Sequence, residues 1–371
     1  MAALTFTGAA SKPAPRPSQL ALIGTYTNNT RSQGIYAAEF DPDSGKLKLK
    51  GLAAATPDPS WIVIHPNGRF VYAANESGKQ SMVTAFTLDT KNAKLTQLNQ
   101  LPALGEDPCY LSFDKAGKFL FVANYTSGNV VVFPIQPDGS LGPHTALVKD
   151  AGSLGPNKAR QEGPHAHWIG VSPDNHFVFV SDLGLDAVLS YRFDAVKGTL
   201  TPNHPPMAQL ASGSGPRHLA FAPNGKYVYV ISELNATITA FSYDPSQGSL
   251  FEMQIVSTLA NLVAGSRNDA AEISVSPDGN NLYVSNRGPD TISAFAVSST
   301  DGSLTHTGDY PTEKEPRHFT IDPSGRFLLA ENQNSNSVTA FRIDPASGAL
   351  SRGSQVGDIP SPVCLAFLPN L

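Results

Sequence analysis

The amino-acid sequence predicts an all-β fold, a seven-bladed β-propeller with four-stranded antiparallel blades, on three observations. Apolar residues occur in short Val, Ile, Phe and Tyr runs separated by turn residues, in a chain with 31 Gly and 30 Pro. One phrase of strand, turn and strand recurs six times along the chain. The two ends carry complementary halves of a seventh copy. A β-sandwich would not explain six ungapped copies of one unit.

Each full copy contains an apolar strand, a turn of the Pro-Asn-Gly or Pro-Asp-Gly kind, a second apolar strand, a polar break and a third strand. A Gly-containing turn and a short fourth strand follow. Successive copies begin about 50 residues apart, which is the spacing of propeller blades and longer than that of a parallel solenoid. The six full copies begin at Pro59, Pro108, Ala166, Pro216, Ala270 and Pro316.

The last blade is expected to close by pairing the two ends of the chain. The segment PVCLAFLPN from Pro362 corresponds to a first strand cut off at its turn, whereas the segment from Leu20 lacks a first strand and has the rest. Joining them would pair strand edges that otherwise expose backbone groups. We therefore expect a single propeller domain over residues 20–371.

Residues 1–19 are rich in Ala, Pro, Ser and Thr and show no periodic pattern. They predict a disordered leader or the stub of a removed export signal. No apolar run reaches the roughly 20 residues of a membrane span, so no membrane partner is expected. The net charge of −5 and the lack of basic runs argue against a nucleic-acid partner. A monomer that binds a small molecule is the expectation.

Several kinds of site lack support in the sequence. There is no phosphate-binding glycine loop, dinucleotide fingerprint or Gly-x-Ser-x-Gly elbow, so no nucleotide cofactor or serine nucleophile is expected. His165 and His167 could face one way as zinc ligands, but no third ligand stands at a recognisable spacing, and no metal is expected. Cys109 and Cys364 are interpreted as small core residues without a disulfide.

The repeat register predicts a site on one rim of the channel. Residues equidistant from a hairpin turn are antiparallel neighbours, so Arg217 and Glu233, each eight residues from Gly225, should lie together. Structural positions repeat from blade to blade, yet titratable residues break the repeat on this rim, which favours a functional site. The residues that break it are His167, Arg217, Glu233 and Arg287, and the rim neighbours expected to contact the substrate are His218, Glu272, Arg317, His318 and Asn332.

A plainer interpretation applies to other polar residues of the rim. The Asn, Asp or Ser that recurs at the end of each second strand is typical of a turn residue that bonds local backbone. Glu76 and Tyr125 follow two of these residues and are consistent with simple exposure.

Several phrases resemble the lactonase propeller family, which contains bacterial 6-phosphogluconolactonase and the fungal carboxymuconate cyclase. These phrases cover the chain after Gln19 and include PHAHWIGVSPD from Pro164, GPRHLAFAPNGKYVYVISE from Gly215, YVSNRGPDTISAF from Tyr283 and PRHFTIDPSGRFLLAENQ from Pro316. The resemblance implies a propeller without a required metal. It also implies an active site of His165 or His167 with Arg217, Glu233 and Arg287. The chain departs from the family pattern at Pro289, where a His is expected, and at His318, where an Asn is expected.

The function implied is lactone hydrolysis, with 6-phosphogluconolactone as the leading substrate. Glu233 or a His of the pair would take the proton from water while Arg217 faces the oxyanion, and Arg287, Arg317 and His318 would hold an anionic group. An unphosphorylated sugar lactone, muconate cyclisation and a non-catalytic binding propeller are the alternatives. A sugar-phosphate substrate implies the cytoplasm, and an export signal upstream of residue 1 would instead imply an exported or periplasmic enzyme.

Overall fold

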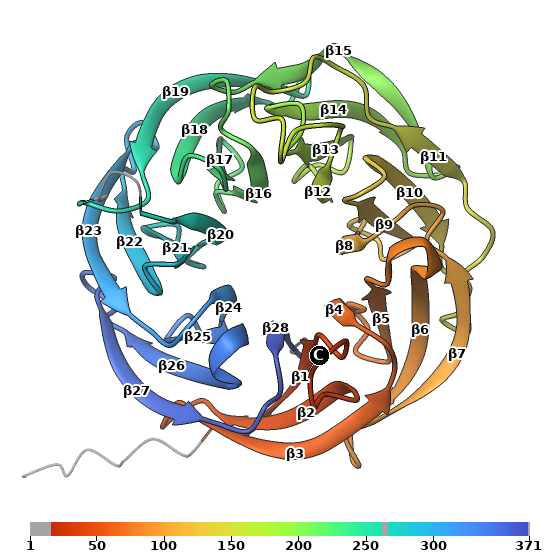
Figure 1. Cartoon of the computed structure of the whole chain (residues 1–371), viewed down its shortest axis with the longest axis vertical. Helices are drawn as coiled ribbons and strands as arrows, with labels where there is room; N and C mark the ends of the chain where they lie inside the picture. Colours follow the sequence, from red (N-terminus) through yellow and green to blue (C-terminus); the bar gives the residue numbers. More distant parts are fainter. Residues whose placement is uncertain (1–15, 262–265, 370–371) are drawn as a thin grey trace, which may run out of the picture.

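The chain forms a ring of sheets around a central channel (Figure 1). A computed structural model describes residues 16–261 and 266–369, and in these residues the strands form seven four-stranded antiparallel sheets. Each sheet is one blade, with its first strand at the channel and its last strand at the outer edge. The predicted seven-bladed propeller is therefore confirmed.

The blades are numbered I to VII from the first complete copy of the repeat. Blade I contains β4 (Pro59–Ile64), β5 (Phe70–Asn75), β6 (Met82–Asp89) and β7 (Lys94–Pro102). Blade II contains β8 (Pro108–Phe113), β9 (Phe119–Asn124), β10 (Asn129–Pro134) and β11 (Ala146–Lys149). Blade III contains β12 (Ala166–Val171), β13 (Phe177–Asp182), β14 (Ala187–Asp194) and β15 (Thr199–Gln209). Blade IV contains β16 (Pro216–Phe221), β17 (Tyr227–Ser232), β18 (Thr237–Asp244) and β19 (Ser249–Ser257).

The remaining blades follow the same order, except that blade VII takes its strands from both ends of the chain. Blade V contains β20 (Asp269–Val275), β21 (Asn281–Arg287), β22 (Thr291–Val297) and β23 (Leu304–Pro311). Blade VI contains β24 (Pro316–Ile321), β25 (Phe327–Asn332), β26 (Ser337–Ile343) and β27 (Leu350–Val356). Blade VII contains β28 (Pro362–Phe367), β1 (Gln19–Thr25), β2 (Gly34–Asp41) and β3 (Lys46–Ala55).

Two short 3₁₀ helices, η1 (Gly78–Gln80) and η2 (Gln333–Ser335), complete the elements of the described residues. No helix in this part of the chain has the length and apolar character of a membrane span.

The ends of the chain close the ring as predicted. Strand β28 lies antiparallel beside β1, with Phe367 opposite Ala21 and Cys364 opposite Gly24 (Figure 1). Strand β1 begins one residue before the expected Leu20. Residues 1–15 of the predicted leader lie outside the described residues, so its nature and the domain boundary stay predictions.

The inner hairpin turns explain why the repeat carries Gly at one position. Gly225, between β16 and β17, has φ of +68°, a left-handed conformation that only Gly adopts without cost. Blade III has Asn175 there at +66°, and Asn is the residue that tolerates this region best after Gly. These turns lie at the lower face. The beginning of the first strand and the end of the second strand of each blade therefore lie together at the upper rim.

The second strand of each blade is buried between neighbouring blades. Burial on both faces explains its continuous apolar sequence, and β5, β9, β13 and β25 are buried along their whole length. Tyrosine side chains of these strands reach the next blade and donate hydrogen bonds to its backbone. The Tyr72 hydroxyl donates to the Gly139 carbonyl oxygen at 2.8 Å, and Tyr229 and Tyr283 repeat this contact with Gly302 and Gly348. Such contacts fix the spacing of the blades around the channel.

A β-bulge in every innermost strand shapes the upper rim. In β16, Pro216 pairs with Ser232 and His218 with Ile231, which leaves Arg217 without a partner in the ladder. A bulge bends its strand and re-aims the extra side chain, and here it turns that side chain toward the channel. The residues at this position around the ring are Ser60, Cys109, His167, Arg217, Ala271, Arg317 and Val363.

Candidate active site

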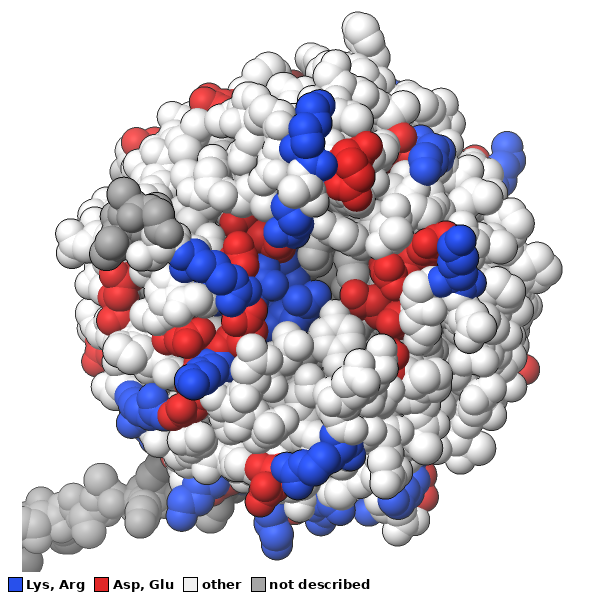
Figure 2. Space-filling view, in the orientation of Figure 1, with Lys and Arg blue, Asp and Glu red and all other residues white. Residues whose placement is uncertain are grey.

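A polar cavity of about 380 Å³ occupies the upper mouth of the channel. Figure 2 shows it as the central hollow, with basic side chains inside and acidic residues at its edge, and among the described residues its lining contains four arginines and no lysine. A narrower chamber adjoins it, and the volume that the centre of a water molecule can occupy there is about 10 Å³. Six of the seven bulge residues line one or both spaces, all but Ala271. The lining of the larger cavity is Glu76, Cys109, Tyr125, Arg160, His167, Glu233, Arg267, Asp269, Arg287 and Arg317.

Glu233 lies at the centre of a cluster of arginines. Arg217 Nε is 3.1 Å and Arg287 Nη2 2.9 Å from its Oε2, and Arg160 Nη2 is 2.5 Å from its Oε1. The predicted proximity of Arg217 and Glu233 is therefore confirmed. Burial alone would raise the pKa of Glu233, but Arg287, Arg217 and Arg160 hold it well below the ordinary value. Glu233 is a permanently charged anchor for the cations of the site.

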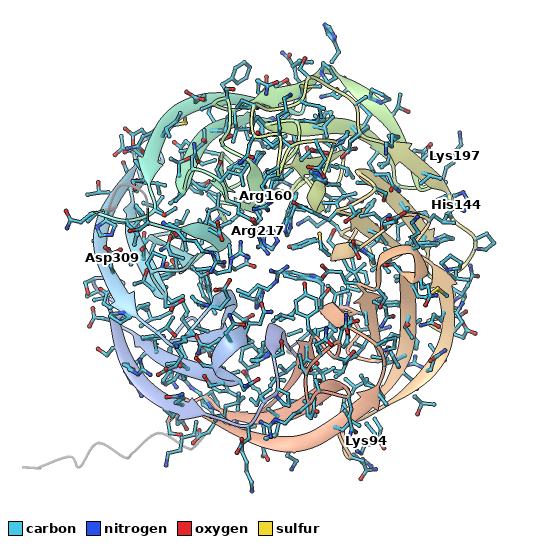
Figure 3. All side chains as sticks on the ribbon, viewed as in Figure 1. Lys94, His144, Arg160, Lys197, Arg217 and Asp309 are labelled. Carbon is cyan, nitrogen blue, oxygen red and sulfur yellow. The ribbon has the colours of Figure 1, made fainter. Side chains whose placement is uncertain are left out.

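Arg217 is held rigidly by further contacts. Its Nη1 donates to the Ala271 carbonyl oxygen at 2.6 Å and to His218 Nε2 at 3.2 Å. Figure 3 shows Arg217 and Arg160 close together beside the channel. Burial, together with Arg287 and Arg317, lowers the pKa of Arg217 to about 10, so the guanidinium remains charged at neutral pH. A fixed, poorly solvated cation is suited to face a developing negative charge.

The two histidines of the Pro-His-Ala-His phrase have different surroundings. His167 lines the cavity, and its Nδ1 lies 3.6 Å from the Cys109 thiol. Burial and Arg217 keep its pKa well below 6.5, so its imidazole is neutral. His165 instead stacks on Tyr125, with ring centroids 4.6 Å apart, and is not among the residues that line the cavity. The pair that the sequence left open thus resolves to one residue facing the cavity, His167.

Arg317 comes from β24 of blade VI, two blades round the ring from the blade that carries Glu233. It lies above the Tyr26 ring, and its Nη2 donates to the Tyr26 hydroxyl at 3.0 Å. That hydroxyl donates in turn to Glu76 Oε2 at 2.8 Å. Among the described residues no carboxylate oxygen lies within 4.0 Å of the Arg317 guanidinium. Arg317 is therefore a half-buried cation of the cavity that retains capacity to bind an anion.

His218, Glu272 and His318 form a layer beneath the cavity and do not line it. His218 Nδ1 donates to Glu272 Oε2 at 3.0 Å, because its Nε2 accepts from Arg217. His318 Nδ1 lies 2.6 Å from Glu331 Oε2. Burial raises the pKa of Glu272 to about 8 and, with Arg217, lowers that of His318 to about 3. The layer supports Arg217 from below, and the Trp61 ring packs edge-on against both histidines.

Asn332 has a structural environment. Its Nδ2 donates to Thr339 Oγ1 at 3.0 Å, and its Oδ1 accepts from Thr312 at 2.9 Å. The equivalent Asn75 also bonds two threonines, although its Oδ1 accepts from Thr84 and its Nδ2 donates to Thr56. Asn332 therefore follows the plainer interpretation given to this repeat position, and it does not line the cavity.

Six residues of the cavity lining escaped the sequence interpretation, as did Tyr26 of the chamber; the six are Glu76, Tyr125, Arg160, Cys109, Arg267 and Asp269. The first two occupy the rim position after the recurring Asn, so the repeat contains a signal, although polar residues at this position are also typical of simple exposure. Arg160 comes from the irregular segment between β11 and β12, where the repeat gives no register. Tyr26 lies just after β1, in the blade whose halves are separated by the whole chain.

A pair of carboxyl groups supports the segment that carries His165. Asp182 Oδ1 accepts hydrogen bonds from the backbone N–H groups of His165 and Leu185, at 2.8 and 3.0 Å. Asp150 interacts with Asp182, and one oxygen of each is buried without another partner. Burial and Asp182 raise the pKa of Asp150 well above 3.8, so the two groups share a proton.

We expect Asp150→Asn to stabilise the protein at neutral and alkaline pH. A group whose pKa is raised on folding contributes stability at low pH and loses it as the pH rises through the folded pKa. The Asn amide can donate to Asp182 without titrating, which should add about 1–2 kcal/mol at pH 8. Thermal unfolding from pH 5 to 9 measures this change in stability. Asp174→Asn, at an inner turn of blade III, is the control. An equal melting-temperature difference at every pH would contradict the shared proton.

The described residues contain no group of three His, Cys, Asp or Glu side chains placed to hold a metal ion. Cys109 and Cys364 are both free and buried, and burial raises the pKa of each thiol far above its ordinary value.

Comparison with known proteins identifies this arrangement. Residues 20–367 match the family model described as a seven-bladed β-propeller lactonase. The chain belongs to the seven-bladed β-propeller lactonase family. The resemblance noted in the sequence is therefore confirmed, and the protein is a lactone-hydrolysing carboxylic ester hydrolase.

Individual relatives of this lactonase differ in the substrate that their names give. The 6-phosphogluconolactonase of Bacillus subtilis is 35% identical over 347 residues, covering 93% of this chain and 97% of the relative. The 6-phosphogluconolactonase of Formosa agariphila is 33% identical and covers 80% of this chain and 84% of the relative. The periplasmic gluconolactonase of Pseudomonas aeruginosa superposes with a TM-score of 0.88 at 32% identity, over 95% of this chain and 99% of that chain.

Proposed function

We propose that this lactonase hydrolyses 6-phosphogluconolactone to 6-phosphogluconate, with the reacting carbonyl beside Arg217. One observation carries the proposal: Arg217 and Arg287 are anchored on one carboxylate, with Arg287 at the wall of the water-accessible cavity and Arg217 at the wall of the narrower chamber that adjoins it. Attack of water on a lactone produces a tetrahedral oxyanion, and fixed donors aimed at that charge stabilise the transition state more than the ground state. The similarity to the Bacillus subtilis enzyme supports this choice of lactone.

Glu233 serves this reaction by fixing the arginines. The sequence left open whether it is the base or the group that orients Arg217, and its low pKa favours the second role, because a strongly stabilised carboxylate is a weak base. His167 is neutral and can hydrogen-bond to the lactone without adding charge to the cavity.

The substrate phosphate would bind Arg317. Arg287, also proposed for this role from the sequence, is already paired with Glu233, and His318 lies in the layer below the cavity. Arg317 faces the cavity with its planar donor group, the geometry that suits a phosphate. A phosphorylated substrate implies the cytoplasm for this enzyme, whereas a preference for gluconolactone would favour the exported alternative.

We expect Arg317→Ala to raise KM for 6-phosphogluconolactone at least tenfold more than for gluconolactone. A charge-assisted hydrogen bond to phosphate contributes about 1.5–3 kcal/mol, enough for such discrimination. Steady-state kinetics with both lactones measures the ratio, and Arg326→Ala, which lines a separate hollow with Asp278 and Asp344, is the matched arginine control.

Two results would count against the proposal. Equal increases in KM for both lactones would mean that Arg317 does not recognise phosphate. A wild-type enzyme that prefers gluconolactone would replace the proposed substrate with an unphosphorylated one, as the name of the Pseudomonas aeruginosa neighbour indicates for that protein.

A further inference from the structure

Hydrolysis also needs a base that takes a proton from the attacking water, and the arginine cluster does not supply one. The narrow chamber beside the cavity indicates where that water and its base could lie. This chamber is lined by Glu76, Ser60, Cys109, Arg217 and Arg317, among other residues. Its free volume of about 10 Å³ is close to the space that one ordered water requires. A buried water also needs two to four polar partners, and the wall offers them.

Ser60 supplies an independent sign that a water belongs there. The Ser60 side chain is 6% exposed, and its Oγ makes no hydrogen bond of good geometry with the described residues, although the hydroxyl lies close enough to Glu76 to lower the pKa of that carboxyl group. A buried hydroxyl without a partner costs free energy unless a ligand or water satisfies it. Because Ser60 occupies the bulge position of blade I, its hydroxyl faces the same space as Glu76.

Glu76 differs from the other acidic residues of the cavity wall. Glu233 and Asp269 each form an ion pair with an arginine, with nitrogen–oxygen distances of 2.5 to 3.1 Å. Among the described residues, Glu76 forms no such ion pair. One Glu76 oxygen accepts the Tyr26 hydroxyl, and the carboxyl group lines both the cavity and the chamber. We propose that Glu76 is the general base, taking a proton from a water held between its carboxylate and Ser60.

The proposed step rests on the proposed lactone hydrolysis and balances as follows. The water oxygen bonds to the carbonyl carbon, one water proton passes to Glu76, and the carbonyl oxygen becomes an oxyanion facing Arg217. When the carbonyl re-forms, the bond to the ring oxygen breaks and that oxygen takes the proton from Glu76. The product acid then releases the second water proton to solvent, and Glu76 is again a carboxylate.

The electrostatics of the wall agree with this role. Burial raises the pKa of Glu76 above its ordinary 4.5, although Arg317 opposes the change, and a carboxylate of higher pKa is a stronger base. Burial and Arg217 act in the opposite direction on His167 and weaken it as a base. Of the two uncommitted groups, Glu76 is thus favoured by its position beside the chamber and by the direction of its pKa shift.

The test compares Glu76→Gln with His167→Asn, using any lactone that the wild-type enzyme hydrolyses. Glu76→Gln should lower kcat by about 10² and remove the acid limb of the pH profile, the pH range in which activity rises as the base ionises. His167→Asn should keep that limb. Retention of the limb in Glu76→Gln together with its loss in His167→Asn would overturn the proposal and make His167 the base.

Further variants keep the proposal falsifiable if Glu76→Gln fails to fold. Tyr26→Phe removes the donor to the ionised Glu76 and should move the acid limb to higher pH. Ser60→Ala should lower kcat and move the limb in the same direction, because the Ser60 hydroxyl also lowers the pKa of Glu76. An unmoved limb in Tyr26→Phe would contradict Glu76 as its source. Failure of the wild type to hydrolyse any lactone would instead refute the proposed function, so the two failures are distinguishable.

Discussion

Arg217→Ala is expected to lower kcat by about 10³ while leaving the fold nearly unchanged. Removal of one preorganised donor to an oxyanion costs roughly 10² to 10³ in rate, and Arg217 also organises the lactone side of the cavity. The fold tolerates the change because Glu233 keeps Arg287 and Arg160 as ion-pair partners, so no buried carboxylate is left alone. Steady-state kinetics and thermal unfolding of the same preparation test both halves of the expectation.

Glu233→Gln is the informative contrast. It removes the anion from a cluster in which three guanidinium groups converge, so their mutual repulsion is no longer compensated. We therefore expect a loss of both activity and melting temperature, where Arg217→Ala loses activity alone. A Glu233→Gln protein as stable as the wild type would show that the cluster does not depend on this carboxylate. An Arg217→Ala enzyme within tenfold of wild type would place the oxyanion elsewhere.

The repeat made the blades and part of the site predictable for one physical reason. A hairpin of fixed length brings residues equidistant from its turn together, so Arg217 and Glu233 could be paired from numbering alone. The bulge was not visible in the sequence, yet it falls at the same place in every copy. Comparing equivalent positions therefore identified the residues that face the channel even though their exact pairing was unknown.

The remainder of the site depends on contacts that the repeat does not encode. Arg160 reaches Glu233 from a segment without regular secondary structure, and no periodicity fixes the path of such a segment. Glu76 shares its repeat position with residues of varied type, so its burial against Tyr26 became evident only when blades I and VII were brought side by side. His218 and His318 were placed correctly on the innermost strands, but their side chains point to the layer below the cavity.

Deletion of residues 362–371 is expected to abolish the soluble native state. The deletion removes β28, the innermost strand of blade VII, and with it the buried Val363, Cys364 and Leu365. Strand β1 would lose its partner and expose an unpaired edge to the channel, while β24 and β4 would lose a neighbour. Removal of residues 1–15 is the control, because every contact of the described residues remains in place.

A circular permutant separates loss of closure from mere loss of apolar contacts. Phe367 lies opposite Ala21, and the Leu368 N–H donates to the Leu20 carbonyl oxygen at 2.9 Å, so a short turn can join the end of β28 to Gln19. A chain that begins at Pro362, passes through this turn into residues 19–361 and ends there would have blade VII built like the other six. We expect it to fold, to retain lactonase activity and to melt within a few degrees of the wild type. A soluble, equally stable deletion of residues 362–371, or a permutant that cannot fold, would contradict closure of the ring by its two ends.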